Sequence, residues 1–104
     1  MYANGNGVPK DVVQAAAWYR QAAEQEDKWA QYNLAFAYIL GQGVQRDTVQ
    51  ALIWFRKAAE HGHAGAQFQL GVAYNNGDTV PRDYVTAYMW LNLSAAQGER
   101  EPEK

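Results

Sequence analysis

The stretch YILGQGVQRDTVQALIWFRKAA, residues 38–59, occurs in three variant copies along the chain. Residues 2–23 read YANGNGVPKDVVQAAAWYRQAA and residues 74–95 read YNNGDTVPRDYVTAYMWLNLSA, so equivalent positions lie 36 residues apart. A fixed period between about 20 and 50 residues indicates a stacked array of structural repeats. Residues that recur in every copy are expected to serve the architecture, and residues that differ are free to carry function.

The composition is that of one globular domain with a packed core. The chain has 104 residues, of which 48% are apolar, and a net charge of −2. Its charges are interspersed, so no basic run indicates a nucleic-acid partner. The absence of cysteine excludes disulfides and thiolate metal sites.

The start of the chain shows no secretory signal pattern, and localisation stays open between cytoplasm and periplasm. The longest charge-free stretch, 29–45, is too short and too polar to span a bilayer, so direct membrane insertion is not expected.

Each period contains the signals of two helices. An aspartate precedes the longer helical pattern and is expected to cap it, because a carboxylate accepts the free amide hydrogens of the first turn. A glutamine three residues later completes a capping box in two copies, whereas Thr86 weakens the box in the third. The predicted capping residues are Asp11, Asp47 and Asp83, and the predicted helices span 11–25, 29–40, 47–61, 64–76 and 83–97.

The longer helices carry a stripe of alanines and aromatic residues at helical spacing, which predicts a buried face. Gly62 and Gly98 are expected to end the second and third of these helices in the left-handed conformation. Glu26 holds that register in the first copy, where we expect a different helix end because the left-handed conformation costs a non-glycine residue about 1 kcal/mol. The predicted stripes are Ala15, Trp18, Tyr19, Ala22 and Ala23; Ala51, Trp54, Phe55, Ala58 and Ala59; and Ala87, Trp90, Leu91, Ser94 and Ala95.

These motifs resemble the Sel-one-like repeat. The resemblance rests on Leu70-Gly71-x-x-Tyr74-x-x-Gly77, on Val80-Pro81-Arg82-Asp83, and on Ala87-x-x-Trp90 with Ala95-Ala96-Gln97-Gly98, and the copy at 34–62 matches as well. It implies an all-α, right-handed α-solenoid of tetratricopeptide-like helix pairs that serves as an adaptor or scaffold. In this family helix A is the Leu-Gly-Tyr helix and helix B the Trp-Ala-Ala helix. A cysteine-rich branch is linked to β-lactam binding, and the lack of cysteine argues against it here.

The repeat register also predicts the domain organisation. We expect a single domain over 1–104 with about two and a half repeats, bounded near 1–27, 28–63 and 64–99, and a charged tail at 99–104. The chain opens on what would be the last turn of a helix A, which suggests a piece of a longer array. About two and a half repeats is near the lower limit for an independent solenoid.

Most chemistry-bearing residues have a structural interpretation. The repeated aspartates are more simply caps than catalytic carboxylates, and the tryptophans Trp18, Trp54 and Trp90 are more simply core than a stacking platform. His61 and His63 flank a glycine without a third ligand at metal-binding spacing, so no metal or other cofactor is expected. Ser94 has no histidine near it in sequence to serve as its base. The sequence therefore predicts a non-enzymatic protein.

The remaining candidate site is the face of helix A on which the copies disagree. In tetratricopeptide-like arrays the positions off the packing stripe line a concave groove, and here they form a predicted site for a partner helix or an extended peptide. An alternative is that the apolar half of this face, with Trp29, Phe36 and Ile39, packs against an upstream helix A. The predicted groove residues are Trp29, Tyr32, Phe36, Ile39, Phe68, Val72, Asn75 and Asn76.

Two other functions are considered. Exposed apolar residues at the solenoid ends could join copies of the chain into homo-oligomers, through Trp29 and Phe36 at one end and Tyr88, Met89 and Leu93 at the other. The remote alternative is a β-lactam-related enzyme, which would need cysteines and a convergent polar site.

Overall fold

A computed structural model of the chain describes residues 10–77 and 79–100. The described residues form five α-helices without strands: α1 (Lys10–Glu24), α2 (Lys28–Leu40), α3 (Thr48–Glu60), α4 (Ala64–Asn76) and α5 (Tyr84–Arg100). Each of these bounds lies within three residues of the prediction. The last helical turn predicted near residues 1–5 and most of the predicted charged tail lie outside the described residues.

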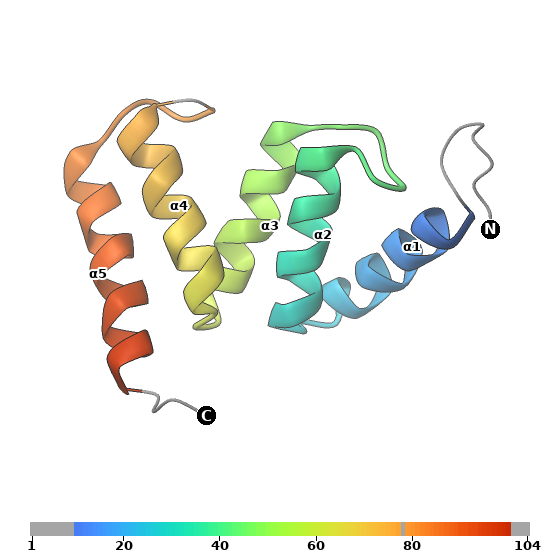
Figure 1. Ribbon diagram of the computed structural model, residues 1–104, viewed down its shortest axis with the longest axis horizontal. Helices are drawn as coiled ribbons and strands as arrows, with labels where there is room; N and C mark the ends of the chain where they lie inside the picture. Colours follow the sequence, from blue (N-terminus) through green and yellow to red (C-terminus); the bar gives the residue numbers. More distant parts are fainter. Residues whose placement is uncertain (1–9, 78, 101–104) are drawn as a thin grey trace.

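The helices follow one another in space in the order of the sequence, from α1 at one end to α5 at the other (Figure 1). Each helix packs mainly on its neighbours in the chain, with the α2–α3 and α4–α5 pairs in closest contact. The molecule measures 44 × 34 × 24 Å. Helices A of the second and third repeats are therefore α2 and α4, and helices B are α1, α3 and α5. This is an all-α helical repeat solenoid, as the sequence predicts.

The helix ends show why these segments fold where they do. Asp47 caps α3 by accepting hydrogen bonds from the amides of Val49 and Gln50, both at 3.1 Å. Gly41 and Gly77 end α2 and α4 with φ near +70°, which a glycine adopts without steric cost. The structure adds two caps that the aspartate pattern did not include. Asp27 accepts hydrogen bonds from two amides at the start of α2, and His63 accepts one at the start of α4.

Four predictions about helix ends need correction. Asp11 is not a cap, because α1 begins at Lys10 and places it in the first turn, where a carboxylate still favours the positive end of the helix dipole. Thr86 strengthens the third cap, since its amide and its hydroxyl both donate to Asp83. Glu26 adopts the left-handed conformation after all, with φ 73°. Gly98 does not end its helix, because α5 continues to Arg100 and no further helix among the described residues requires a turn there.

The core runs along the middle of the array. All five predicted stripe residues of α3 are buried, including Phe55 at 1% exposure. The stripes of the outer helices are buried less completely. Trp18 is 63% exposed, in contrast to Trp54 and Trp90, and Ala95 is exposed as well. The prediction that all three tryptophans are core is therefore wrong for Trp18: α2 packs on α3 and α4 on α5, but no described helix takes that place beside α1.

Candidate functional site

The eight predicted groove residues lie on two helices. Their side chains range from half-buried to exposed, with Trp29 64% and Phe68 50% accessible to solvent. We call this set the groove face. The residues on α2 are Trp29, Tyr32, Phe36 and Ile39, and those on α4 are Phe68, Val72, Asn75 and Asn76.

The three aromatic residues in the α2 part of the groove face form one cluster anchored in the core. The Tyr32 ring lies 5.0 Å from the Phe36 ring and 5.8 Å from the Phe55 ring, measured between centroids. On its other side Tyr32 stacks on the imidazole of His63, with the ring centroids 4.2 Å apart and an interplanar angle of 26°. The Trp29 ring meets the same imidazole nearly edge-on at 4.5 Å. The exposed side chain of Trp29 is therefore held in position by its contact with His63.

His63 is the residue of this cluster that sequence reasoning did not place there. It caps α4, where its Nδ1 accepts a hydrogen bond from the amide of Ala66 at 3.1 Å, so Nε2 carries the proton of the neutral ring. Burial lowers the pKa of His63, and the nearby positive charge of Lys28 lowers it further. His63 occupies the repeat position of the capping residue Asp27, and that register is the sequence signal that could have identified it.

Gly65 lets the cluster form. A Cβ atom at this position would lie 3.0 Å from Cε1 of His63 and 3.1 Å from two ring atoms of Tyr32. The first turn of α4 can approach the Tyr32 ring because glycine has no side chain. The variable residue at this position of helix A is thus explained by a close contact between neighbouring repeats.

The α4 part of the groove face differs in chemistry. Phe68 makes no ring-to-ring contact with any described aromatic side chain. Asn75 and Asn76 are exposed, and the amide of one donates to the carbonyl oxygen of the other at 3.4 Å. The structure thus combines Trp29, Tyr32 and Phe36 with Phe55 and His63 into one cluster, which no aromatic contact extends to Phe68 on α4.

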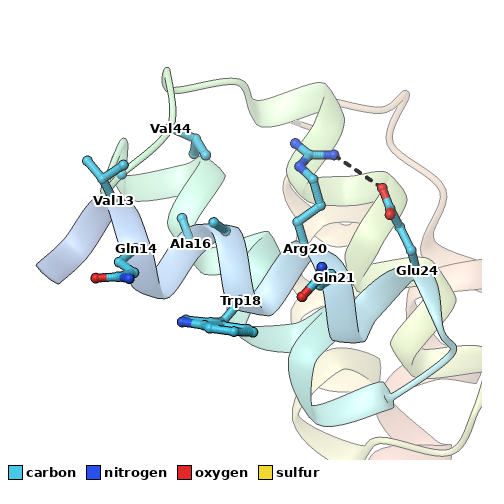
Figure 2. A pocket seen from close by; sticks show the side chains of 10 residues that line it. Val13, Gln14, Ala16, Trp18, Arg20, Gln21, Glu24 and Val44 are labelled. Carbon is cyan, nitrogen blue, oxygen red and sulfur yellow. Dashed lines mark ion pairs between the residues drawn. The ribbon is translucent and has the colours of Figure 1, made fainter. Parts of the chain in front are cut away.

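Two apolar grooves lie along helices B, whereas the predicted groove face is on helices A. Neither groove was predicted from the sequence. One, of about 600 Å³, lies along α1 between Val13, Trp18 and Val44 (Figure 2). The other, of about 350 Å³, lies along α3 between Val49 and Val80. Val13 and Val44 are 36 residues before Val49 and Val80, so the two grooves are one feature of successive repeats. The exposed valines at 13, 49 and 85 are the sequence signal for it.

The described residues show no catalytic arrangement. No group of three histidine, cysteine, aspartate or glutamate residues within them could hold a metal ion. The hydroxyl of Ser94 donates to the carbonyl oxygen of Ala64 at 2.9 Å. The hydrogen bonds from the amide and the hydroxyl of Thr86 lower the pKa of Asp83, as expected of a capping carboxylate. Within 10–77 and 79–100 no helix has the length and apolar character needed to cross a membrane.

Comparison with known proteins agrees with the repeat geometry. The model of the Sel1 repeat matches residues 1–27, 30–63 and 64–99. The chain belongs to the Sel1 repeat family. Repeats of this family commonly serve as protein-interaction scaffolds. A search of the curated proteins finds no match.

Two solved structures show how far the likeness extends. A protective antigen present in uropathogenic Escherichia coli strains, which displays an SLR fold, is 46% identical with a TM-score of 0.81 over 91% of this chain. A Sel1 repeat protein from Oxalobacter formigenes is 37% identical with a TM-score of 0.81 over 84% of this chain. The chain covers only 20% of the first protein and 36% of the second.

Proposed function

We propose that this Sel1 repeat chain is a non-enzymatic interaction module whose groove face binds an apolar peptide or partner helix. The observation that carries this proposal is Trp29, which is 64% exposed while its ring rests against the buried His63. An aromatic residue held in position loses little entropy on binding, and such residues dominate the energetics of protein interfaces. Phe68, 50% exposed on the next helix A, supplies a second anchor.

The charge of the groove face indicates the kind of partner. The two helices A carry Lys28 as their only charged side chain, whereas helix α3 alone carries Arg56, Lys57 and Glu60. The exposed amides of Asn75 and Asn76 can bind the backbone of an extended chain. We therefore propose a partner segment with apolar side chains and few charges, whose binding changes little with ionic strength.

The test is a display selection of random peptides against the chain, followed by affinity measurements on two variants. Trp29→Ala is expected to reduce the affinity for the selected peptides by about 2 kcal/mol, roughly thirtyfold. Trp18→Ala is the matched control, because Trp18 is 63% exposed and lies outside the groove face. Equal loss of affinity in both variants, or none in Trp29→Ala, would refute the groove face as the binding surface.

Self-association is the second candidate, favoured by the outer face of α5. Five large apolar residues are exposed there, a density that is unusual for a free surface. Light scattering would show a mass that rises with concentration, and Val85→Lys would suppress the rise; a monomer at every concentration would exclude this function. The exposed residues are Tyr84, Val85, Tyr88, Met89 and Leu93.

A further inference from the structure

A chain of polar groups crosses the joint between the first and second repeats, outside the groove face. Gln31, which is 2% exposed, donates a hydrogen bond from Nε2 to the carbonyl oxygen of Ala23 at 3.1 Å. Its Oε1 lies 3.2 Å from Nδ1 of His61. The other ring nitrogen of His61, Nε2, lies 3.0 Å from Oε1 of Glu26. The chain thus links the end of α1, the following turn, α2 and the end of α3.

The orientation of Gln31 is fixed by its partner, because a carbonyl oxygen can only accept a hydrogen bond. Gln67, in the same position of the next repeat, donates to the carbonyl oxygen of Ala59 in the same way, at 3.2 Å. The side-chain oxygen of Gln31 therefore faces His61, and both ring nitrogens of His61 face oxygen acceptors. A neutral imidazole has one N–H and can satisfy only one of these contacts, whereas an imidazolium satisfies both.

The charge nearest to His61 also favours the cation, because Glu26 is its ion-pair partner. Three carboxylates and one ammonium group line the same cleft, which has a volume of about 290 Å³: Glu24 from α1, Glu26 from the turn, and Glu60 and Lys57 from α3. His61 is in addition the C-cap of α3, where the free carbonyl groups favour a positive charge. Glu24 and Glu60 are ion-paired with Arg20 and Arg56 of their own helices, so the carboxylate that faces His61 directly is that of Glu26.

We propose that His61 is a proton-dependent clamp between the first two repeats, which as an imidazolium holds both Glu26 and Gln31 and on deprotonation releases one of them. Histidine changes its charge between about pH 5 and 8, so mild acidification would fix the angle between these repeats. The clamp also accounts for Glu26, which adopts φ 73° where the next repeat has Gly62. Since only the imidazolium makes both contacts, the stabilisation that the second contact adds is present at low pH and lost as the pH rises.

The direct test is an NMR titration of the imidazole nitrogens of His61 in the folded protein and in the chain unfolded by urea. We expect both nitrogens to stay protonated to a higher pH in the folded protein. The proposal fails if the ring titrates at the same pH, or at a lower pH, in the folded state.

A second test compares unfolding of the wild type with that of His61→Gln, which introduces the residue that Gln97 provides at the same repeat position. The wild type is expected to be more stable relative to the variant at pH 5.5 than at pH 8. The ratio of the two unfolding equilibrium constants, variant over wild type, should be about two- to fivefold larger at pH 5.5. Glu26→Gln should remove this gain. The titration of His63 cancels, since all three proteins contain it. An equal ratio at both pH values, or a gain that persists in Glu26→Gln, would overturn the proposal.

Discussion

At the scale of single residues, two histidines separated by one glycine have opposite electrostatic environments. His63 is 6% exposed, stacked on Tyr32, and bound through Nδ1 to the amide of Ala66. His61 is more exposed and faces the carboxylate of Glu26. From the sequence alone, His61 and His63 could be interpreted only as a weak chelating motif. The contacts that distinguish the two histidines come from α2 and from the turn after α1, which lie far away in the chain.

The pKa of His63 gives a prediction with a definite sign. Burial lowers this pKa, so protonation is less favourable in the folded protein than in the unfolded chain. The stability that depends on neutral His63 is present above the pKa of an unfolded histidine, about 6.5, and is lost as the pH falls below it. We expect unfolding by urea to become easier between pH 7 and pH 5 in a His61→Gln background, where the clamp is absent.

The control for this prediction is His63→Asn in the same background, because asparagine can also cap a helix but does not titrate. Its stability should change less over the same pH range. A loss of stability on acidification that is as large in the asparagine variant would show that His63 is not responsible.

At the scale of helices, α4 and α5 approach each other so closely at Gly71 that a side chain there would clash. Gly71 stands where the second repeat has the buried Ala35, and Leu91 stands where it has Phe55. A Cβ atom at Gly71 would lie 2.6 Å from Cγ and Cδ2 of Leu91 and 3.2 Å from the carbonyl oxygen of Ala87. The exchange of alanine for glycine therefore allows α5 to pack directly on the backbone of α4.

This contact predicts that Gly71→Ala destabilises the protein although alanine is the better helix former. The gain in helix propensity is about 1 kcal/mol, and the clash should cost about 1–3 kcal/mol. We expect a net loss in the free energy of unfolding, measured with urea. In a Leu91→Ala background, which removes the clashing atoms, Gly71→Ala should instead stabilise. A gain of stability in the wild-type background would show that α5 moves aside without cost.

At the scale of the whole molecule, the position of a repeat in the array decides what its residues do. Trp18 and Trp54 occupy the same position in the period, yet Trp18 is 63% exposed and Trp54 only 9%. Trp54 lies in the core that α2 and α3 share, whereas α2 is the only described helix in close contact with α1. The groove along α1 in Figure 2 is larger than its counterpart along α3 and includes Trp18 for the same reason.

The two tryptophans should therefore respond differently to truncation. Trp54→Ala is expected to cost about 3–5 kcal/mol, a large part of the stability of a small domain. Trp18→Ala should change the free energy of unfolding by less than about 1 kcal/mol. Chemical denaturation followed by circular dichroism measures both, and the two results can be compared directly because the substitution is the same. Equal costs would mean that Trp18 is covered in solution.

The sequence by itself determined the repeat architecture, because the 36-residue period, the caps and the alanine-aromatic stripes act through local backbone chemistry and helix packing that recur in each copy. It also placed the groove residues on α2 and α4, whose role in binding stays a prediction. The tertiary structure decided which side chains are exposed and which meet: the exposure of Trp18, the stack of Tyr32 on His63, and the contact of His61 with Glu26. These depend on distances between residues far apart in the chain, and the periodic pattern, being the same in every copy, contains no information about them.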